Sequence, residues 1–267
     1  MRIFVRKLAV NYAVTNSVSR MKMSMAAVAA PRIATNNVSD GLNVALAKET
    51  LRNADAVCFD FDSTLICEEG IDELAKYCGA GEAVATWTKK AMDGGTRFQD
   101  ALAARLDLIK PSRQDVEQCL IKHPPLLSPR AAEFVQSLRM HGKAVHIVSG
   151  GFRAMIEPVA ATELGVSAND ILANTIYWDE AGNYAGFNPN EMTAADGGKP
   201  KAIAHLKRTR GYNTVVMIGD GATDAQAKPP ADAFIGYGGV VQRQAVVSTA
   251  DWFVLDFADL IAALQQS

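Results

Sequence analysis

The stretch AVCFDFDSTLICEEG, residues 56–70, joins a short apolar run to four acidic side chains. An apolar run of this length is typical of a strand that is buried on both faces of a parallel sheet. Asp60 and Asp62 follow two positions apart, so on an extended chain their side chains leave the same face. Carboxylates that crowd together raise one another's pKa unless a cation or a proton lies between them. The stretch therefore predicts a buried strand whose end either binds a cation or has its charges spread by the fold.

Four further apolar runs of strand length predict the rest of the sheet, at residues 144–148, 214–218, 233–235 and 252–255. The stretches between them have the periodicity of helices. Residues 128–143, for example, begin with Ser-Pro, a good helix start, and reach Gly142, a good helix stop. This alternation predicts an α/β protein with a Rossmann-like parallel sheet and helices on both of its faces.

Two insertions interrupt the alternation. Residues 67–125 are helical in pattern, with the amphipathic segments GIDELAKYCG and RFQDALAARLDLI, and predict an inserted helical cap domain. Residues 173–189 predict a hairpin, because aromatic and β-branched residues flank a turn near 180–183. The predicted domains are an extension of residues 1–39, a core of residues 40–66 and 126–267, and a cap of residues 67–125.

The composition is that of a globular enzyme: 267 residues, 49% hydrophobic and 21% charged, with a net charge of −2. No Lys/Arg run occurs in the body of the sequence, which argues against nucleic acid as a partner. No apolar stretch approaches the roughly 20 residues that span a bilayer, so we expect a soluble protein. The four cysteines lack a C-x-x-C pair, which disfavours a zinc site or a disulfide framework and favours an intracellular compartment.

The first 39 residues differ from the remainder, because they contain six basic and no acidic side chains. An acid-free, Arg-bearing start without a long apolar segment suits the transit peptide of an organelle, either a plastid (chloroplast) or a mitochondrion. The alternatives are a disordered extension with a chance bias in charge, or a sequence that begins upstream of a true start at Met21, Met23 or Met25. In either case the protein would be cytoplasmic.

Three of the predicted strands end in polar signatures: DFDST at 60–64, SGG at 149–151 and GDGATD at 219–224. The carboxyl ends of strands in an open α/β sheet meet at one edge, where ligands bind. A nucleophilic carboxylate, a second carboxylate for proton transfer and approachable backbone N–H groups suit phosphoryl transfer. Mg²⁺ commonly binds through one or two carboxylates plus a substrate phosphate. The edge therefore predicts a magnesium and phosphate site, with Lys199 of GGKPKA near it.

Each signature is weak by itself, because Asp, Ser and Gly also favour turns and a single lysine is usually a surface residue. Their occurrence together and in order, three of them at strand ends, is hard to obtain by chance. His146 is different. It is one imidazole in a predicted buried strand with no spaced partner, so we predict a core residue and no ligand.

These motifs resemble the haloacid dehalogenase superfamily of phosphotransferases, and within it the branch that acts on phosphoserine. The resemblance covers most of residues 45–265 and rests on DFDSTLICEEGIDELAKYCGAG, ALAARLDLIKPSR, VSGGFRAMIEPVA, GGKPKAI and above all MIGDGATDAQAKPPADAFIGYGG. It implies a Rossmann-like core with a helical cap and dependence on Mg²⁺. It also implies hydrolysis of the small molecule O-phospho-L-serine through a phosphoaspartate, the last step of phosphorylated serine biosynthesis.

Carried over by position, the resemblance implies a role for each matching residue. Asp60 would be the nucleophile and Asp62 the general acid and base. Mg²⁺ would be held by Asp60, Asp220 and the backbone carbonyl of Asp62, with support from Asp224. The substrate-binding residues would be Ser149, Gly150 and Lys199 for the phosphoryl group, Glu69 for the ammonium, Arg105 for the carboxylate, and Met92, Phe98 and Thr223 as further contacts.

Two positions depart from the family pattern. Phe61 stands where a small aliphatic residue is more frequent, and its side chain should point into the core. Lys228 stands where a small residue or a cysteine is frequent. Two other functions stay open: a phosphatase of the same superfamily for another small phosphomonoester, which Glu69 and Arg105 disfavour, and a non-catalytic sensor of a phospho-amino acid, which Asp62 disfavours. The oligomeric state is left open.

Overall fold

Helix α2 (Val38–Asn53) is the first element that the computed structural model describes. The described residues are 38–92 and 96–266, and side chains are described for 43–88 and 96–266. The predicted transit peptide therefore lies almost wholly outside the described residues and stays a prediction. Gly41–Ser267 form one structural unit, which begins within α2.

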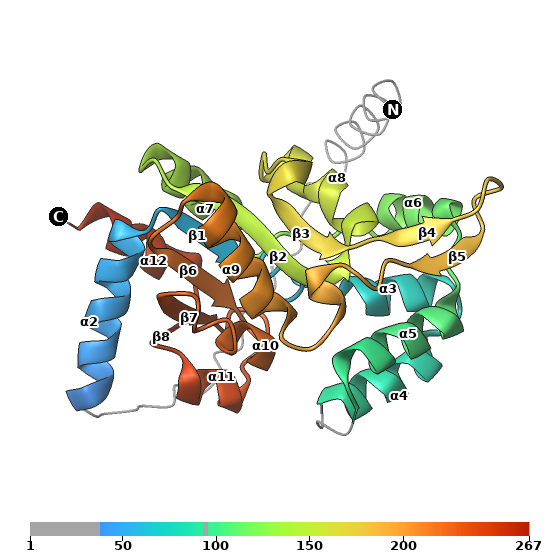
Figure 1. Ribbon diagram of the computed structural model, residues 1–267, viewed down its shortest axis with the longest axis horizontal. Helices are drawn as coiled ribbons and strands as arrows, with labels where there is room; N and C mark the ends of the chain where they lie inside the picture. Colours follow the sequence, from blue (N-terminus) through green and yellow to red (C-terminus); the bar gives the residue numbers. More distant parts are fainter. Residues whose placement is uncertain (1–37, 93–95, 267) are drawn as a thin grey trace, which may run out of the picture. The chain divides into compact units, whose positions relative to one another are not determined.

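One parallel sheet of six strands, in the order β3-β2-β1-β6-β7-β8, runs through this unit (Figure 1). The strands are β1 (Ala56–Phe59), β2 (Ala144–Phe152), β3 (Ile171–Asn174), β6 (Val215–Gly219), β7 (Ala233–Tyr237) and β8 (Trp252–Val254). The strand that carries the paired aspartates is therefore central, with Cys58 of β1 opposite His146 of β2 on one side and Met217 of β6 on the other. All four residues of β1 are buried, as expected for a strand that is covered on both faces.

Helices cover both faces of the sheet. Alternate side chains of β1 point to opposite faces and pack into two different hydrophobic clusters. Val57 and Phe59 pack into a cluster with α2, α7 (Ala131–Met140), α8 (Arg153–Glu163) and α12 (Phe257–Gln265). Ala56 and Cys58 pack into a cluster with α9 (Gly198–Arg210), α10 (Ala222–Ala225) and α11 (Gln244–Thr249). The predicted α/β class, with a parallel sheet between two layers of helices, is confirmed.

Four helices are inserted between β1 and β2, and we call them the cap helices. They are α3 (Gly70–Tyr77), α4 (Gly81–Met92), α5 (Phe98–Ile109) and α6 (Arg113–Lys122). Their apolar side chains, among them Leu74, Leu102 and Leu106, form one cluster together with Phe152 of β2 and Met155 of α8. Helix α6 begins at a capping box, in which Ser112 Oγ accepts from the N–H of Asp115 and the Asp115 carboxylate accepts from the N–H of Ser112. The boundaries of a separate cap domain at residues 67 and 125 stay a prediction.

The chain leaves the core for the cap helices and returns from them along two adjacent segments. Ile66 and Leu127 form an isolated antiparallel bridge. The N–H of Cys67 donates to the carbonyl of Leu126 over 2.8 Å, and the N–H of Ser128 donates to the carbonyl of Leu65 over 2.9 Å. These bonds define a short two-stranded connection, which we call the hinge ribbon.

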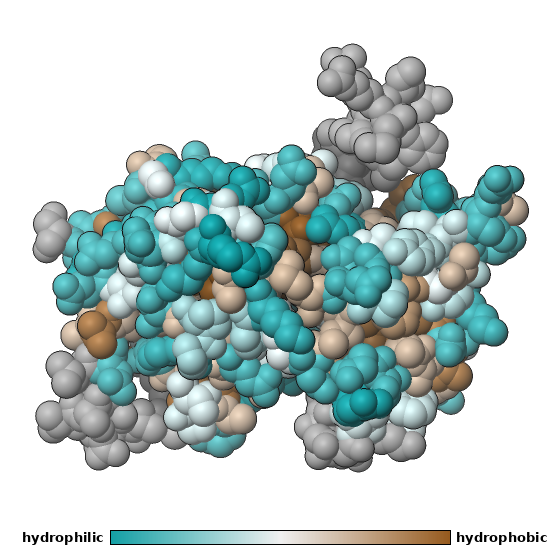
Figure 2. Space-filling model, in the orientation of Figure 1, coloured by the Kyte–Doolittle hydropathy of each residue, from teal (hydrophilic) through white to brown (hydrophobic). Residues whose placement is uncertain are grey.

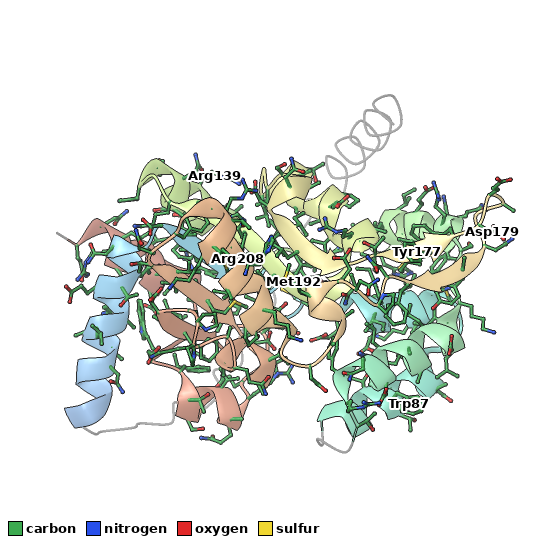
Figure 3. The ribbon with its side chains drawn as sticks, in the orientation of Figure 1. Trp87, Arg139, Tyr177, Asp179, Met192 and Arg208 are labelled. Atoms are coloured by element: carbon green, nitrogen blue, oxygen red, sulfur yellow. The ribbon has the colours of Figure 1, made fainter. Side chains whose placement is uncertain are left out.

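The hairpin predicted over residues 173–189 is shorter than expected. Ile171–Asn174 is strand β3 of the main sheet, and only β4 (Ile176–Trp178) and β5 (Tyr184–Phe187) form the hairpin. The prediction missed β3 because this strand runs into the hairpin after a single residue, Thr175. Asp179 lies at the tip of the hairpin (Figure 3), where its carboxylate accepts from the N–H of Asn183 over 2.8 Å. Two short 3-10 helices, η1 (Ala168–Asp170) and η2 (Met192–Ala194), flank β3 and the hairpin.

The surface carries few large apolar side chains. The face in Figure 2 is mainly hydrophilic, with small and separate hydrophobic areas. Among the described residues the exposed large hydrophobics include Leu126, Met140 and Leu46, which come from different elements. Within residues 38–92 and 96–266, no helix is both long enough and apolar enough to cross a membrane.

Candidate active site

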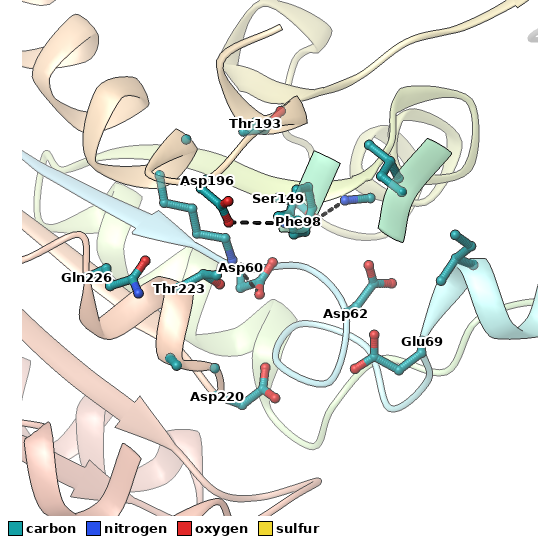
Figure 4. Close-up of a pocket in the computed structure, with 18 of the residues that line it drawn as sticks. Asp60, Asp62, Glu69, Phe98, Ser149, Thr193, Asp196, Asp220, Thr223 and Gln226 are labelled. Carbon is teal, nitrogen blue, oxygen red and sulfur yellow. Dashed lines mark hydrogen bonds and ion pairs between the residues drawn. The ribbon is translucent and has the colours of Figure 1, made fainter. Parts of the chain in front are cut away.

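The carboxyl ends of β1, β2 and β6 meet at one edge of the sheet and open into a cavity of about 480 Å³. Cavities of this size suit a small-molecule ligand. Figure 4 shows Asp60 between Thr223 on one side and Asp62 on the other. The predicted site residues that line the cavity are Asp60, Asp62, Glu69, Phe98, Arg105, Ser149, Gly150, Lys199, Asp220 and Thr223. Strand ends far apart in sequence therefore supply one site, as the motif spacing predicts.

Asp60 is held at the end of β1 by two donors on different oxygens. Its Oδ1 accepts from the N–H of Phe61 over 2.7 Å, and its Oδ2 lies 2.6 Å from Nζ of Lys199. Nζ of Lys199 also lies 2.5 Å from Oδ1 of Asp224. Burial acts to lower the pKa of Lys199, but the Asp224 and Asp60 carboxylates outweigh it and raise that pKa above its usual value. Lys199 is therefore a fixed positive charge beside Asp60.

Lys199 lies in the first turn of α9, and the backbone before it is tightly packed. A Cβ on Gly198 would fall 2.3 Å from the carbonyl oxygen of Met192, so only glycine fits there. Gly197 has a φ of 69°, in the left-handed region that glycine adopts freely. The two glycines of GGKPKA thus set the start of the helix that delivers the lysine.

Asp62 also lines the cavity, and its environment differs from that of Asp60. Its Oδ1 accepts from the N–H of Gly70, the first residue of α3, over 2.9 Å. Burial, and then the charges of Glu69 and Asp60, raise the pKa of Asp62 well above its usual range. Between the two aspartates, the Phe61 side chain is 1% exposed and packs into the core, which confirms the alternation predicted for this stretch. Asp60 and Asp62 therefore face the same cavity, and the surroundings of Asp62 favour its protonated form.

A three-carboxylate cluster suited to a divalent cation lies next to Asp60. One oxygen each of Asp60, Asp220 and Asp224 lies within 4.8 Å of the others. The Thr64 hydroxyl donates to Asp220 over 2.9 Å, and the N–H of Gly221 donates to Asp224 over 2.9 Å. Burial, followed by the charge of Asp60, raises the pKa values of both Asp220 and Asp224. Buried oxygen ligands with this excess of negative charge fit a hard cation such as Mg²⁺.

The SGG motif, residues 149–151 within the carboxyl-terminal end of β2, forms the opposite wall for a phosphate. Ser149 Oγ accepts from the N–H of Gly151 over 3.0 Å, where the pairing of β2 with β3 is irregular, and we call this segment the SGG loop. A Cβ on Gly150 would lie 2.8 Å from the ring of Phe98, and one on Gly151 would lie 2.8 Å from Asp62 Oδ2. The absence of side chains here lets the backbone approach a ligand closely, as an anion site requires.

The cap helices contribute one anionic and one cationic group. Glu69 accepts from the Ser63 hydroxyl over 2.7 Å. Burial lowers the pKa of Arg105, although the charges of Asp72, Glu69 and Asp62 oppose that change. Arg105 Nε donates to the carbonyl of Ala101, but in the described part of the chain no carboxylate lies within 4 Å of the guanidinium. The side chain of Met92, the remaining predicted contact, lies outside the described residues.

Arg243 is a cavity residue that the motifs did not indicate. Its Nε lies 3.0 Å from Asp220 Oδ2, and its Nη2 lies 3.7 Å from Glu69 Oε1. It follows Asp224 by 19 positions in VVQRQAV, a segment without a motif, so no local signal points to it. Asn174 is a second residue that the motifs did not indicate, and it acts from behind the cavity wall, because its buried amide donates to the carbonyl of Gly150 over 2.8 Å. The strand-end rule would have found Asn174 had β3 been recognised.

Comparison with known proteins agrees with this site. The family model of haloacid dehalogenase-like hydrolases matches residues 54–229. The chloroplastic phosphoserine phosphatase of Arabidopsis thaliana is 50% identical over 227 residues, covering 83% of this chain and 77% of that protein. The phosphoserine phosphatase of Bos taurus is 49% identical over 214 residues, covering 80% of this chain and 95% of that protein.

A solved structure described as a substrate-bound phosphoserine phosphatase complex superposes with a TM-score of 0.69. Its identity is 25%, and the match covers 78% of this chain and 97% of that one. The identities of the curated relatives extend over most of both chains, and the solved structure shares the fold. The chain therefore belongs to the haloacid dehalogenase-like hydrolases, and within them to the group of the phosphoserine phosphatases.

Proposed function

We propose that this protein hydrolyses O-phospho-L-serine to L-serine and inorganic phosphate, which would complete a phosphorylated route to serine. The observation that carries the proposal is the guanidinium of Arg105, which lines the cavity and has no carboxylate within 4 Å among the described residues. Its Nε donates to the carbonyl of Ala101, so the half-buried guanidinium is hydrogen-bonded but has no acidic partner in contact among the described residues. The carboxylate of phosphoserine would supply that partner, Glu69 would accept from its ammonium, and Lys199 and the SGG loop would bind its phosphate.

Mg²⁺ is the cofactor that this proposal includes. Asp60, Asp220 and Asp224, with the backbone carbonyl of Asp62, would hold it, since the cluster offers close, buried oxygen atoms. Bound there, the ion would neutralise the excess carboxylate charge and polarise the phosphoryl group. The Thr64 hydroxyl and the Arg243 guanidinium would keep Asp220 oriented.

In the first step, an Asp60 oxygen attacks the phosphorus and forms an acyl-phosphate, while the bond from phosphorus to the serine oxygen breaks. The leaving serine oxygen is a poor alkoxide, so it takes the proton that the raised pKa keeps on Asp62. Lys199 Nζ, 2.6 Å from Asp60, offsets the charge that develops on the transferring group.

In the second step, Asp62 works in the opposite direction. Its carboxylate, now ionised, accepts a proton from water as the water oxygen attacks the phosphorus of the phosphoaspartate. The acyl-phosphate bond breaks, inorganic phosphate leaves, and Asp60 and protonated Asp62 are both restored. Splitting one difficult displacement into two is the general advantage of a covalent intermediate.

Phosphate release from a panel of phosphomonoesters tests the function. We expect O-phospho-L-serine to be hydrolysed with a higher kcat/KM than O-phosphoethanolamine, which lacks only the carboxylate, and than glycerol phosphate, which lacks the amino-acid head. Treatment with EDTA should abolish turnover, and added Mg²⁺ should restore it, because the carboxylate cluster needs a divalent cation. Equal rates across the panel would contradict phosphoserine as the substrate. Full activity in EDTA would contradict Mg²⁺ as the cofactor. Binding of phosphoserine without release of phosphate would indicate a non-catalytic sensor.

Replacing Arg105 with alanine is expected to impair phosphoserine hydrolysis selectively. The loss of a charge-assisted contact should cost about 1.5–3 kcal/mol, or roughly a 10- to 100-fold decrease in kcat/KM. Turnover of O-phosphoethanolamine should change little, because that substrate offers Arg105 no carboxylate. Steady-state kinetics on both substrates give the comparison, and equal losses on the two would mean that Arg105 serves the phosphate or the fold.

We also propose that residues 1–39 direct the protein to an organelle, a plastid or a mitochondrion. The support is their composition, six basic and no acidic side chains, together with the name of the Arabidopsis relative, which is chloroplastic. Import of the labelled full chain into isolated chloroplasts and isolated mitochondria, followed by protease treatment, tests the address. The proposal would be contradicted if the chain stays at full length and is digested by the protease with both organelles.

A further inference from the structure

Two hydrogen bonds join the start of cap helix α5 to the loop before α9. The N–H of Phe98, the first residue of α5, donates to the Asp196 carboxylate over 3.2 Å, and the N–H of Asp196 donates to Oε1 of Gln99 over 3.3 Å. Figure 4 shows the Asp196 carboxylate directed at Phe98. We call this reciprocal pair the α5 link.

The α5 link provides helix α5 with an N-terminal cap that its own neighbouring residues do not provide. The first N–H groups of a helix have no partner within it, and a carboxylate placed there also interacts favourably with the helix dipole. The residue at the N-cap position, Arg97, makes no side-chain capping bond. Asp196, 98 positions further along the chain than Phe98, therefore serves as a cap from outside the helix.

Each side of the α5 link carries residues of the proposed site. Along α5, Phe98 packs over Gly150 of the SGG loop, and Arg105 lies further along the same helix and lines the cavity. On the other side, Asp196 precedes Lys199, which contacts both Asp60 and Asp224. The α5 link thus joins the group that would read the substrate carboxylate to the group that would bind its phosphate.

We propose that Asp196 is a positioning residue for substrate recognition, which rests on the proposed function. By capping α5 from the core, it sets the distance between Arg105 and the phosphate-binding residues to match the length of phosphoserine. Asp196 itself needs no contact with the substrate. Its effect is expected on the binding of the amino-acid head and not on the phosphoryl chemistry, which Asp60 and Asp62 perform.

The Asp196→Ala variant tests the proposal with two readouts. Removing a helix cap should raise the KM for O-phospho-L-serine about three- to tenfold. The kcat and the inhibition constant of inorganic phosphate, a product that probes only the phosphate end, should stay within about twofold. In Asp196→Asn the amide oxygen can still accept from the N–H of Phe98, so most of the KM should be recovered.

Two further variants separate positioning from general effects. Asp100→Ala removes an acidic side chain from the same helical turn, but Asp100 is exposed and pairs only with Arg97 among the described residues, so its KM should match wild type. Gln99→Ala breaks the α5 link from the cap side and should raise the KM in the same direction as Asp196→Ala. This variant keeps the test valid if Asp196→Ala does not fold, which thermal unfolding of each variant would reveal.

Several outcomes would overturn the proposal. One is that the KM for phosphoserine stays unchanged in both Asp196→Ala and Gln99→Ala. Another is that the inhibition constant of phosphate rises as much as the KM does. A third is that Asp196→Asn is as impaired as Asp196→Ala. Failure of the proposed function has a different signature, because wild-type protein would then release no phosphate from phosphoserine. The two failures are therefore distinguishable in one set of assays.

Discussion

The Asp62→Asn variant is expected to lose turnover of O-phospho-L-serine by a factor of about 10²–10⁴, because the serine alkoxide can no longer take a proton as it leaves. The substitution keeps the size of the side chain, and its amide oxygen can still accept from the N–H of Gly70. The fold should therefore persist, and thermal unfolding close to that of wild type would confirm that the loss is chemical. Phosphate release under saturating substrate gives the measurement.

The same variant should behave differently with p-nitrophenyl phosphate, whose phenolate leaves with little need of a proton. Asp60 should then still become phosphorylated, while hydrolysis of the phosphoaspartate stays slow because the base is missing. The expected result is a burst of p-nitrophenol stoichiometric with the enzyme, then a slow steady state and an acyl-phosphate that can be trapped on Asp60. Near wild-type turnover of both substrates, or binding of p-nitrophenyl phosphate without a burst, would contradict the role of Asp62.

Replacing Lys199 with methionine is expected to have the largest effect on stability. Lys199 and Asp224 are 6% and 0% exposed and lie 2.5 Å apart, so the substitution leaves a buried carboxylate without its cation. Breaking a buried pair in this way typically costs about 3–5 kcal/mol of unfolding free energy. Denaturant unfolding in metal-free buffer measures it, with Lys201→Met, an exposed lysine two positions along, as the control.

The loss in Lys199→Met should grow as the pH rises. Burial raises the pKa of Asp224 to about 8 even with the lysine present. A carboxyl group with a raised pKa binds its proton more tightly in the folded than in the unfolded protein. The free energy of unfolding therefore decreases as the pH rises from the pKa of Asp in the unfolded chain, about 3.9, through the pKa of Asp224 in the folded protein. The double variant Lys199→Met/Asp224→Asn should recover part of the loss at high pH, and a deficit that is independent of pH would exclude the unpaired carboxylate as its cause.

The sequence predicted the sheet well where local pattern decides the structure. Residues 56–60 and 252–255 are apolar runs between polar segments, and they form β1 and β8 in a parallel sheet. Strand β3 was missed, because only Thr175 separates Ile171–Asn174 from the hairpin, and the last residues of the strand, 173 and 174, were assigned to the hairpin. Length and edge position do not explain the miss, because β8 is shorter, is the other edge strand and was predicted from its apolar run.

The residues of the site divide in the same way. Those in motifs at strand ends, such as Asp60, Ser149 and Asp220, were found, and the structure brings them to one cavity. Their catalytic and binding roles stay predictions. Arg243 and Asp196 were not found, because each acts through contacts with residues that are distant in sequence. Such contacts depend on how the helices and strands pack together. The spacing of residues within a single sequence segment does not predict them.

The hinge ribbon makes the cap helices replaceable in principle. Since Cys67 and Leu126 are hydrogen-bonded neighbours, the inserted segment begins and ends at nearly the same point. Closing a longer or shorter loop at that point changes the entropy cost only slowly with length. A different insert could therefore be exchanged there while β1 still pairs with β2 and β6. The phosphoryl chemistry would stay with the sheet, and substrate choice would become a modular property that an engineered insert could rewrite.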